Sequence, residues 1–366
     1  MTKAGYIVVL SVLMLFFLGL VMVFNTSSAE MLDKHMVEST RSFLWKQSIY
    51  ALLGALAGGV IYSLGYQKVF ALMPYAYAAV LFFLLAVFVP GIGRQYNGAR
   101  RWIGLFGCTF QPSEIAKYIL PMYFAYRIYA LDKITFSQIL KVFFTLGVPL
   151  LCILLEPDNG STFIIGFTLV VCCFLLHIPL LYWAFPLCVS CVLLLSIGWN
   201  MPHVRLRIQA YLHPETDLQG KGHKPYQAKI AAGSGGLWGK GLGESLQKFN
   251  YLPEAKSDYI AAIVAEELGF IGILGMIGSY LFMSMAGFFI AFSSEEKTGF
   301  FLASLLTFLL SFQAFLNLGI VSNLLPSKGT TLPFVSQGGT AMIVNISAVC
   351  LLLSVAKIRR SSCLSL

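Results

Sequence analysis

Charge is scarce in this sequence. Only 11% of its 366 residues are charged, with 16 acidic and 25 basic side chains, whereas 58% are hydrophobic and the mean hydropathy is +0.78. Water-soluble globular proteins carry about 25% charged residues, so the composition excludes an ordinary soluble domain. It predicts an all-α polytopic membrane protein, built as a single membrane domain over residues 1–366, and we expect no nucleic-acid partner.

The chain also lacks a cysteine or histidine pattern that would bind a metal. Six of its eight cysteines lie inside apolar runs, where a thiol acts as a small hydrophobe: Cys152, Cys172, Cys173, Cys188, Cys191 and Cys350. The pair Cys188 and Cys191 has CxxC spacing but no second pair. The histidines at 203, 213 and 223 have no helical spacing, so no cofactor is evident.

Apolar runs long enough to cross a bilayer dominate what remains, since a span needs about 20 residues. About ten are predicted: 6–24, 49–64, 69–89, 115–130, 142–155, 162–176, 179–199, 261–292, 300–324 and 332–356. The first is too long for a signal peptide, so we expect an uncleaved anchor. Residues 200–260 are predicted to form one large extracytoplasmic loop between the seventh and eighth spans.

Topology is not fixed by charge. An even number of spans places both termini on one side, and we take that side as cytoplasmic. Lysines and arginines then divide almost evenly between the two faces, so the positive-inside rule does not decide. Cations on the outer face would be explained by a polyanionic substrate there.

Carboxylates cluster near the start of the run at 261–292. They are Glu244, Glu254, Asp258, Glu266 and Glu267. An ionised group carried to the middle of a bilayer costs about 3 kcal/mol, so acids at the rim of a span need a reason. Asp258 lies between the loop and the helix, which makes it the candidate base. Glu266 and Glu267 are expected to cap the helix or to pair with cations.

A second informative stretch is QYNGARRWIGLFGCTFQPSEIAK, residues 95–117. Pro112 and Glu114 suit the first turn of a helix, and Lys117 lies one turn further on the same face as Glu114. Two interpretations remain open. Either a snorkelling Lys117 pairs with Glu114, or Arg100, Arg101 and the helix N-terminus bind an anion such as phosphate.

Three further stretches carry polar or flexible residues. In EPDNGST, at 156–162, Asp158 is expected to cap the following helix. Glycines between 233 and 243 allow the backbone to approach a ligand or to fold back into the membrane mouth. Between 313 and 345 the chain supplies polar side chains at Gln313, Asn317, Ser336, Gln337 and Asn345, beside Gly338 and Gly339, and they serve either interhelical contacts or ligand contacts.

Four of these motifs together resemble one family. NGARRWIGLFGCTFQPSEIAK, EPDNGST, GSGGLWGKGLG with YLPEAKSDYIAAIVAEELGF, and LPFVSQGGT occur in the order typical of the SEDS proteins of shape, elongation, division and sporulation. The resemblance covers essentially the whole chain, including ten spans and the long loop. NGARRW and the opening helix are more similar to the cell-division members than to the elongation members.

The resemblance implies a peptidoglycan glycosyltransferase that polymerises lipid II on the outer face of the bacterial cytoplasmic membrane, at the division septum. Its expected partners are a class B penicillin-binding protein transpeptidase and other divisome proteins. The family's essential acid falls on Asp258. The residues expected to bind substrate are Arg100, Arg101, Glu114, Lys117, Asp158, Glu254, Lys256, Ser336, Gly338 and Gly339.

The sequence departs from the family pattern in three places. Asn250 stands where division members often have glutamate, Gln337 replaces a usual tyrosine, and Lys256 replaces a usual histidine. Lys256 is expected to favour the charged form of Asp258 and so to make it a weaker base. A divalent cation at the pyrophosphate has no ligand set that the sequence defines.

The chemistry expected of these residues is a single displacement with inversion. Asp258 would take the proton from a sugar hydroxyl, while Arg100, Arg101 and Lys117 hold the pyrophosphate that leaves. Two other classes stay open, a lipid II flippase and a non-catalytic divisome scaffold. Both need a binding surface at the outer face, but neither needs a base.

Overall fold

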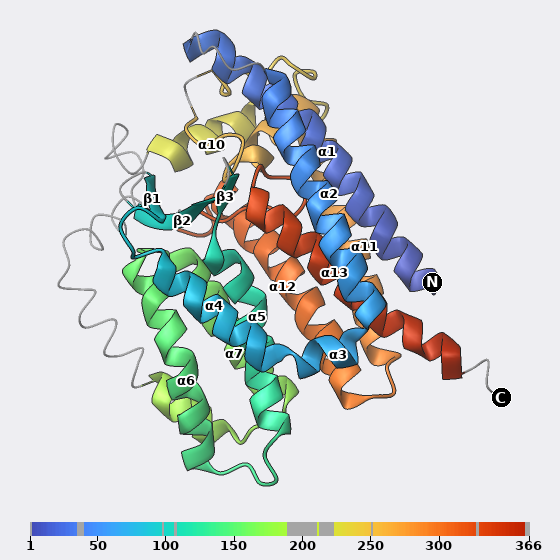
Figure 1. The fold of residues 1–366 in the computed structure, drawn as a ribbon. Helices are drawn as coiled ribbons and strands as arrows, with labels where there is room; N and C mark the ends of the chain where they lie inside the picture. Colours follow the sequence, from blue (N-terminus) through green and yellow to red (C-terminus); the bar gives the residue numbers. More distant parts are fainter. Residues whose placement is uncertain are drawn as a thin grey trace.

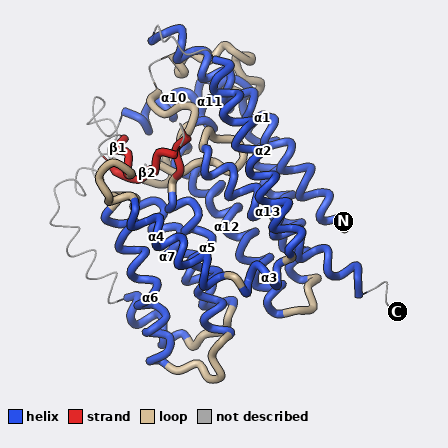
Figure 2. Tube along the Cα trace, viewed as in Figure 1, coloured by secondary structure: helices blue, strands red, loops and turns tan. Residues whose placement is uncertain are grey.

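The computed structural model describes residues 2–34, 40–96, 99–105, 108–188, 211, 223–249, 252–326 and 329–362. Most of these residues form helices that lie side by side, with a small sheet and α10 at one end of the bundle (Figures 1 and 2). The helices are α1 (Lys3–Lys34), α2 (Thr40–Leu64), α3 (Tyr66–Ala71), α4 (Met73–Ala86), α5 (Pro112–Tyr129), α6 (Phe136–Leu155), α7 (Asn159–Leu175), α10 (His223–Ser234), α11 (Ile260–Phe292), α12 (Lys297–Val321) and α13 (Gly339–Ser362).

Six described helices contain segments long and apolar enough to cross a membrane. They are Lys3–Ser28, Phe43–Leu64, Phe136–Leu155, Ile260–Phe292, Lys297–Val321 and Gly339–Lys357. Large apolar side chains point outward along them, for example Leu10, Leu56 and Phe282, each more than 60% exposed. Such a surface suits lipid rather than water. The predicted mostly helical, polytopic membrane protein is therefore confirmed.

One predicted span is interrupted. The apolar run 69–89 was expected to be continuous, but α3 ends at Ala71 and α4 begins at Met73. Pro74 lies in the first turn of α4, where its missing backbone N–H leaves no helical hydrogen bond unmade. The break therefore coincides with a residue that can begin a helix but cannot continue one.

A three-stranded antiparallel sheet corrects the prediction of a purely α-helical fold. Its strands are β1 (Gly93–Tyr96), β2 (Ala99–Leu105) and β3 (Cys108–Phe110), in the order β1-β2-β3. Arg94 pairs with Trp102 and Ile103 with Phe110, with an irregularity in β1 after Arg94. β1 and β3 have only four and three residues, and the seven residues of β2, ARRWIGL, do not alternate between apolar and polar, so no period-two pattern marks the sheet. The ladder nevertheless satisfies backbone groups in the connection between α4 and α5.

Helix α11 is broken at Gly269, whose φ is 68°. The carbonyls of Glu266 and Glu267 accept from the backbone N–H groups of Lys240 and Gly241, at 3.0 and 3.1 Å. Beyond the break, the N–H of Phe270 donates to Gly236 and that of Ile271 to Leu237, at 2.9 and 3.2 Å. The segment 235–243, which is rich in glycine, thus satisfies the backbone groups that the break would leave unpaired.

This packing needs glycine at close range. A Cβ at Gly235 would collide with the backbone of Ala265, and one at Gly239 with the backbone of Glu267. The close backbone approach expected of these glycines therefore occurs, and the group they approach is a helix of the same chain.

Candidate active site

The residues predicted to act together lie at the end of the molecule that carries the sheet and α10 (Figure 1). Arg100 and Arg101 belong to β2, Glu114 and Lys117 to the start of α5, and Asp158 precedes α7. Asp258 lies in the turn before α11, and Ser336 and Gly338 lead into α13, which begins at Gly339. Segments more than 200 residues apart in the chain therefore meet around Asp258.

Three consecutive backbone carbonyls, at positions 256 to 258, accept hydrogen bonds from one neighbouring surface. We call the three donors the carbonyl clamp: Asn317 Nδ2 to the Asp258 carbonyl at 2.8 Å, Ser336 Oγ to the Ser257 carbonyl at 2.5 Å, and the Gln337 N–H to the Lys256 carbonyl at 2.9 Å. The backbone that carries Asp258 is thereby fixed against the end of α12 and the approach to α13.

Two side chains of the carbonyl clamp are themselves held in place by further hydrogen bonds. Asn317 uses its second N–H to bond the Thr330 carbonyl at 2.6 Å, and Ser336 Oγ accepts from the Leu332 N–H at 2.8 Å. Both side chains are nearly fully buried, with Asn317 1% and Ser336 3% exposed. Their rotamers are therefore fixed by packing and by their own hydrogen bonds, as an accurately positioned site requires.

The Asp258 carboxylate faces Gly329. A Cβ added at Gly329 would lie 3.0 Å from Asp258 Oδ2, which is tighter than an ordinary contact. Glycine at this position therefore leaves room beside the carboxylate. On the far side of the same segment, a Cβ added at Gly160 would lie 3.3 Å from the Gly329 carbonyl and 3.7 Å from Asp158 Oδ1.

Burial raises the pKa of Asp258 to about 7. Nearby charges modify this effect: the carboxylates of Glu254 and Asp158 raise the pKa, and Lys224 and Arg101 lower it. A carboxyl that titrates near pH 7 has the basicity that suits a general base at neutral pH.

The weaker base expected from the neighbouring Lys256 is not found, because burial is the largest effect on the pKa of Asp258 and raises it. The Lys256 ammonium lies 4.6 Å from the centroid of the Phe43 ring. Cations that lower the pKa of Asp258 include Lys224 of α10 and Arg101. Lys224 was not among the predicted site residues, because nothing local in HKPYQAK distinguishes it from a solvated lysine.

Asp158 caps α7, as predicted. Its Oδ1 accepts from the Ser161 N–H at 3.2 Å, and its Oδ2 accepts from Ser161 Oγ at 2.7 Å and from Ser113 Oγ at 3.0 Å. Since Ser113 belongs to the first turn of α5, the same carboxylate joins the starts of two helices.

The two arginines of β2 have different roles. Arg101 donates from Nε to the Glu156 carbonyl at 2.9 Å and from Nη2 to the Pro157 carbonyl at 2.5 Å, so its guanidinium braces the turn between α6 and α7. Arg100 is exposed. It is therefore the arginine of this pair that solution ligands can reach most readily.

Glu156 is a buried acid beside that turn. It is 1% exposed, and its two carboxylate oxygens have no hydrogen-bond partner among the described residues. Burial and the charge of Asp158 raise its pKa to about 8, against the opposing effect of Arg101. At neutral pH this carboxyl is therefore mostly protonated.

Lys117 pairs with Glu114, and this pair was part of one of the two interpretations of the helix start. Lys117 Nζ lies 2.8 Å from Glu114 Oε2 and donates to Gln313 Oε1 at 2.9 Å. The ammonium does not snorkel, because the side chain is only 3% exposed. The Lys117 side chain is thus buried and held by its partners Glu114 and Gln313.

Glu266 and Glu267 pair with cations, as predicted. Glu266 lies 2.6 Å from Lys240 Nζ, and Glu267 lies 3.0 Å from Lys248 Nζ. Glu266 also accepts from Ser245 Oγ at 2.5 Å. These acids hold the glycine-rich segment against α11.

Several predicted features lie outside the described residues. They are the turn at Asn97 and Gly98, Cys191, the histidines at 203 and 213, the arginines at 205 and 207, Asn250, and most of the segment 189–222. Among the residues that the structure describes, no group of three or more His, Cys, Asp or Glu side chains could hold a metal ion.

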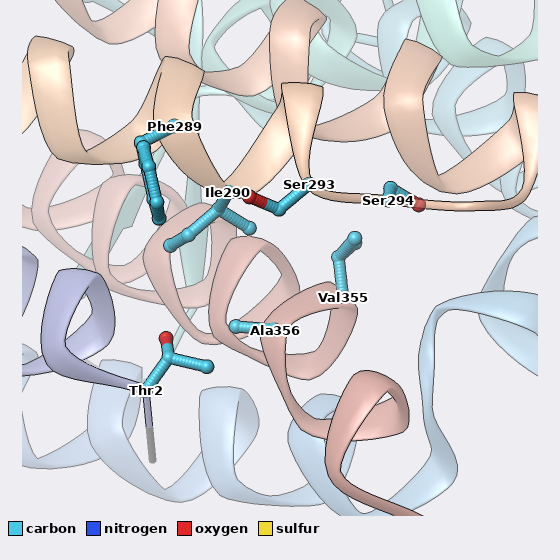
Figure 3. Close-up of a pocket in the computed structure, with 7 residues that line it drawn as sticks. All are labelled: Thr2, Phe289, Ile290, Ser293, Ser294, Val355 and Ala356. Atoms are coloured by element: carbon cyan, nitrogen blue, oxygen red, sulfur yellow. The ribbon is translucent and has the colours of Figure 1, made fainter. Parts of the chain in front are cut away.

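A small pocket occurs away from these residues, where the start of α1 meets the ends of α11 and α13 (Figure 3). Its lining is Thr2, Phe289, Ile290, Ser293, Ser294, Val355 and Ala356. The lining holds no acid, base or cation, so the pocket is not the candidate site.

Comparison with known proteins identifies the family of this chain. Residues 6–361 match the family model FTSW_RODA_SPOVE, described as cell cycle protein. Two similar relatives are both named probable peptidoglycan glycosyltransferase FtsW. The one from Geobacter metallireducens is 38% identical over 92% of this chain and 90% of its own length, and the one from Nitrosomonas europaea is 35% identical over 95% and 92%.

Solved structures share the fold. A chain from a structure on the coordination of polymerization and crosslinking by a peptidoglycan synthase complex has a TM-score of 0.74 at 25% identity, covering 94% of this chain and 97% of that one. A mutant of the rod shape determining protein RodA from Thermus thermophilus has a TM-score of 0.70 at 25% identity, covering 96% and 97%. This chain belongs to the FtsW/RodA/SpoVE family of cell cycle proteins.

Proposed function

We propose that this protein is a peptidoglycan glycosyltransferase that polymerises lipid II into glycan strands during cell division. Relatives named FtsW support the activity, since they match more than 90% of the chain. The observation that carries the mechanism is a partly buried carboxyl, Asp258, with a pKa near 7 on a firmly held backbone beside Arg101 and Lys224.

Asp258 is the base in this proposal. It takes the proton from the 4-hydroxyl of one lipid-linked sugar as that oxygen attacks the anomeric carbon of another. The bond from the anomeric carbon to the phosphate oxygen breaks, and undecaprenyl pyrophosphate leaves with the electron pair. A single carboxylate acting in one displacement gives inversion at the anomeric carbon.

Cations stabilise the leaving pyrophosphate. Arg100 is exposed and Lys224 is partly exposed at this end of the molecule, so these two side chains are placed to contact phosphate oxygens directly. Arg101, tied to the turn before α7, and Lys117, paired with Glu114, add positive charge from behind. Glu114 thus positions Lys117.

The other proposed substrate-binding residues surround Asp258. Glu254 accepts from Ser257 Oγ at 3.0 Å and raises the pKa of Asp258. The carbonyl of Lys256 is held by the carbonyl clamp, and Ser336 is one of its donors. Gly338 and Gly339 open the approach to α13, where a Cβ at Gly339 would meet the ring of Tyr50. Asp158 holds the starts of α5 and α7 together beneath this surface.

The proposed topology has ten spans, both termini in the cytoplasm and the segment 200–260 outside, between the seventh and eighth spans. This arrangement puts Asp258 on the face where lipid II polymerisation occurs. A class B penicillin-binding protein transpeptidase is the proposed partner, together with other divisome proteins at the septum. Similarity to a chain of a peptidoglycan synthase complex supports such a partner.

Two other functions remain as alternatives. A lipid II flippase would use the same cations and broken helices, and a divisome scaffold would use only the surface. Neither uses a base, whereas the raised pKa and the carbonyl clamp both concern Asp258.

The test is polymerisation of lipid II by the purified full chain, with and without the transpeptidase. We expect Asp258→Ala and Asp258→Asn to make no glycan strands, and Glu244→Gln, at an exposed acid of the glycine-rich segment, to retain activity. Glycan strands made equally well by the Asp258 variants would exclude the enzyme as proposed. Movement of lipid II across vesicles without polymer would favour the flippase.

A further inference from the structure

The segment 235–249, here called the glycine-rich loop, turns its cations toward the protein. Lys248 is buried, with its Nζ 3.0 Å from Glu267 and 2.8 Å from Asn25 Oδ1 of α1. Lys240 is 30% exposed, with its Nζ 2.6 Å from the fully buried Glu266. Both lysines of the loop are therefore neutralised by carboxylates of α11.

The apolar side chains of the same loop point outward. The exposed fractions are 65% for Leu237, 80% for Trp238, 60% for Leu242, 62% for Leu246 and 36% for Phe249. A loop that meets water keeps its lysines outside and its leucines inside. The reversed arrangement indicates that the outer surface of this loop contacts an apolar medium.

The apolar surface of the loop continues onto a membrane helix. Backbone hydrogen bonds from Phe270 and Ile271 to the loop fix it beside α11. Phe270, Ile271 and Leu274 are 57%, 46% and 56% exposed, and they belong to a candidate membrane span. The exposed leucines and Trp238 therefore extend a surface that already faces lipid.

The length of α11 gives the depth of the loop. The part after the break, residues 270–292, is about 34 Å long at about 1.5 Å per residue. The hydrocarbon core of a bilayer is about 30 Å thick, so this part alone spans it. Phe270 then lies near one boundary of the hydrocarbon, which is the outer boundary in the topology proposed above, and the loop bonded to it lies at the same level.

We propose that the glycine-rich loop is an interfacial anchor, with Leu237, Trp238, Leu242 and Leu246 inserted among the lipids of the outer leaflet. Tryptophan is favoured at this depth, because its ring is apolar and its N–H is polar. Exposed Glu244 stays at the headgroups. The inference is independent of the proposed activity, since it uses neither Asp258 nor a substrate.

The anchor also sets the height of the site above the membrane. Glu266 and Glu267 lie on the short part of α11 that begins two residues after Asp258, and they are the acids that bind the loop lysines. The depth of the loop is therefore linked mechanically to the position of the carboxylate.

The test uses tryptophan fluorescence of the full chain in phosphatidylethanolamine and phosphatidylglycerol vesicles. The difference between the parent and Trp238→Phe isolates the emission of Trp238 among the five tryptophans. We expect lipids brominated near the glycerol end of the acyl chain to quench this component at least twofold, and aqueous iodide to quench it little. The matched control is Trp183→Phe, because Trp183 is 6% exposed and should respond weakly to both quenchers.

A second tryptophan, placed elsewhere in the loop, tests the proposal independently of Trp238. Leu242→Trp, placed in the Trp238→Phe chain, should show the same pattern of quenching by lipid bromine. Quenching by iodide without quenching by brominated lipid would overturn the proposal and place the loop in water. Weak lipid quenching, combined with loss of iodide quenching when the transpeptidase is added, would identify a protein-binding surface and would overturn it equally.

Discussion

Asn317 donates a hydrogen bond from its side-chain amide to the backbone carbonyl of Asp258, at 2.8 Å. The other N–H of the same amide bonds the Thr330 carbonyl at 2.6 Å. One buried amide thus joins the backbone of the candidate base to the segment that contains Gly329, the glycine facing its carboxylate. Asn317 is accordingly a positioning residue, since it acts on Asp258 without itself contacting the carboxylate.

Asn317→Asp should lower kcat about 10- to 100-fold with little change in KM. The substitution keeps the shape but replaces two donors with acceptors facing carbonyls, and each unsatisfied buried group costs about 1–3 kcal/mol. Steady-state polymerisation of lipid II over a pH series would measure the effect, because displacement of Asp258 should also shift the pH profile.

The matched control for this change is Asn345→Asp. Asn345 is buried on α13 and accepts a hydrogen bond from Tyr118 at 2.8 Å, which an aspartate can also accept. Equal losses of activity in the two variants, with an unchanged pH profile in Asn317→Asp, would contradict a specific positioning role.

Activity should rise with pH through about 7, because Asp258 must lose its proton to act as a base and its pKa is about 7. The charge of Glu254 raises that pKa, so Glu254→Gln should move the rising limb to lower pH. The ratio of rates at pH 6 and pH 8 measures the shift. Glu244→Gln is the control, and a limb that moves equally in both variants would argue against local electrostatics.

Asp258→Asn should stabilise the protein above pH 7. The folded-state pKa of Asp258 is raised, so between about pH 4 and pH 7 the folded chain holds a proton that the unfolded chain has lost. Stability therefore falls as pH rises through this window, and above it the ionised carboxylate carries the full cost. Asparagine removes that cost, so we expect a higher Tm in detergent at pH 8 and little change at pH 4. A lower Tm at pH 8 would contradict the assignment.

Glu156→Gln should have little effect near pH 7, because the pKa of Glu156 is about 8 and glutamine resembles the protonated acid. Glu156→Ala should destabilise the protein by about 1–3 kcal/mol, because it leaves a cavity beside the turn that Arg101 braces. Thermal unfolding of the two variants distinguishes the contribution of the side-chain shape of Glu156 from that of its charge. A large loss with glutamine would show that the ionised form is required.

Lys248→Met should lower stability strongly, since removing one partner of a buried ion pair costs about 3–5 kcal/mol. The double variant Lys248→Met with Glu267→Gln should recover much of the loss, because no unpaired buried charge remains. Thermal unfolding of the parent, both single variants and the double variant completes the cycle. Additive losses would contradict coupling between Lys248 and Glu267.

Local sequence patterns are enough to predict the class of the protein and several local features of the site. Long apolar runs predict membrane helices because every backbone polar group inside lipid must bond within its own segment. Asp158 as a helix cap and Glu114 beside Lys117 were likewise predictable, since each depends on residues three positions apart.

Other properties of the fold and the site depend on packing between segments that are distant in the chain. Burial makes Asp258 a stronger base, whereas the neighbouring Lys256 predicted a weaker one, and burial depends on segments remote in the chain. The break at Gly269 and the inward lysines of the glycine-rich loop depend on partners 19 or more residues away. The small sheet has strands that are short or lack an alternating pattern. Local sequence patterns indicate which hydrogen bonds and ion pairs one segment can make within itself. These features arise where one segment pairs the backbone groups or the charges of another.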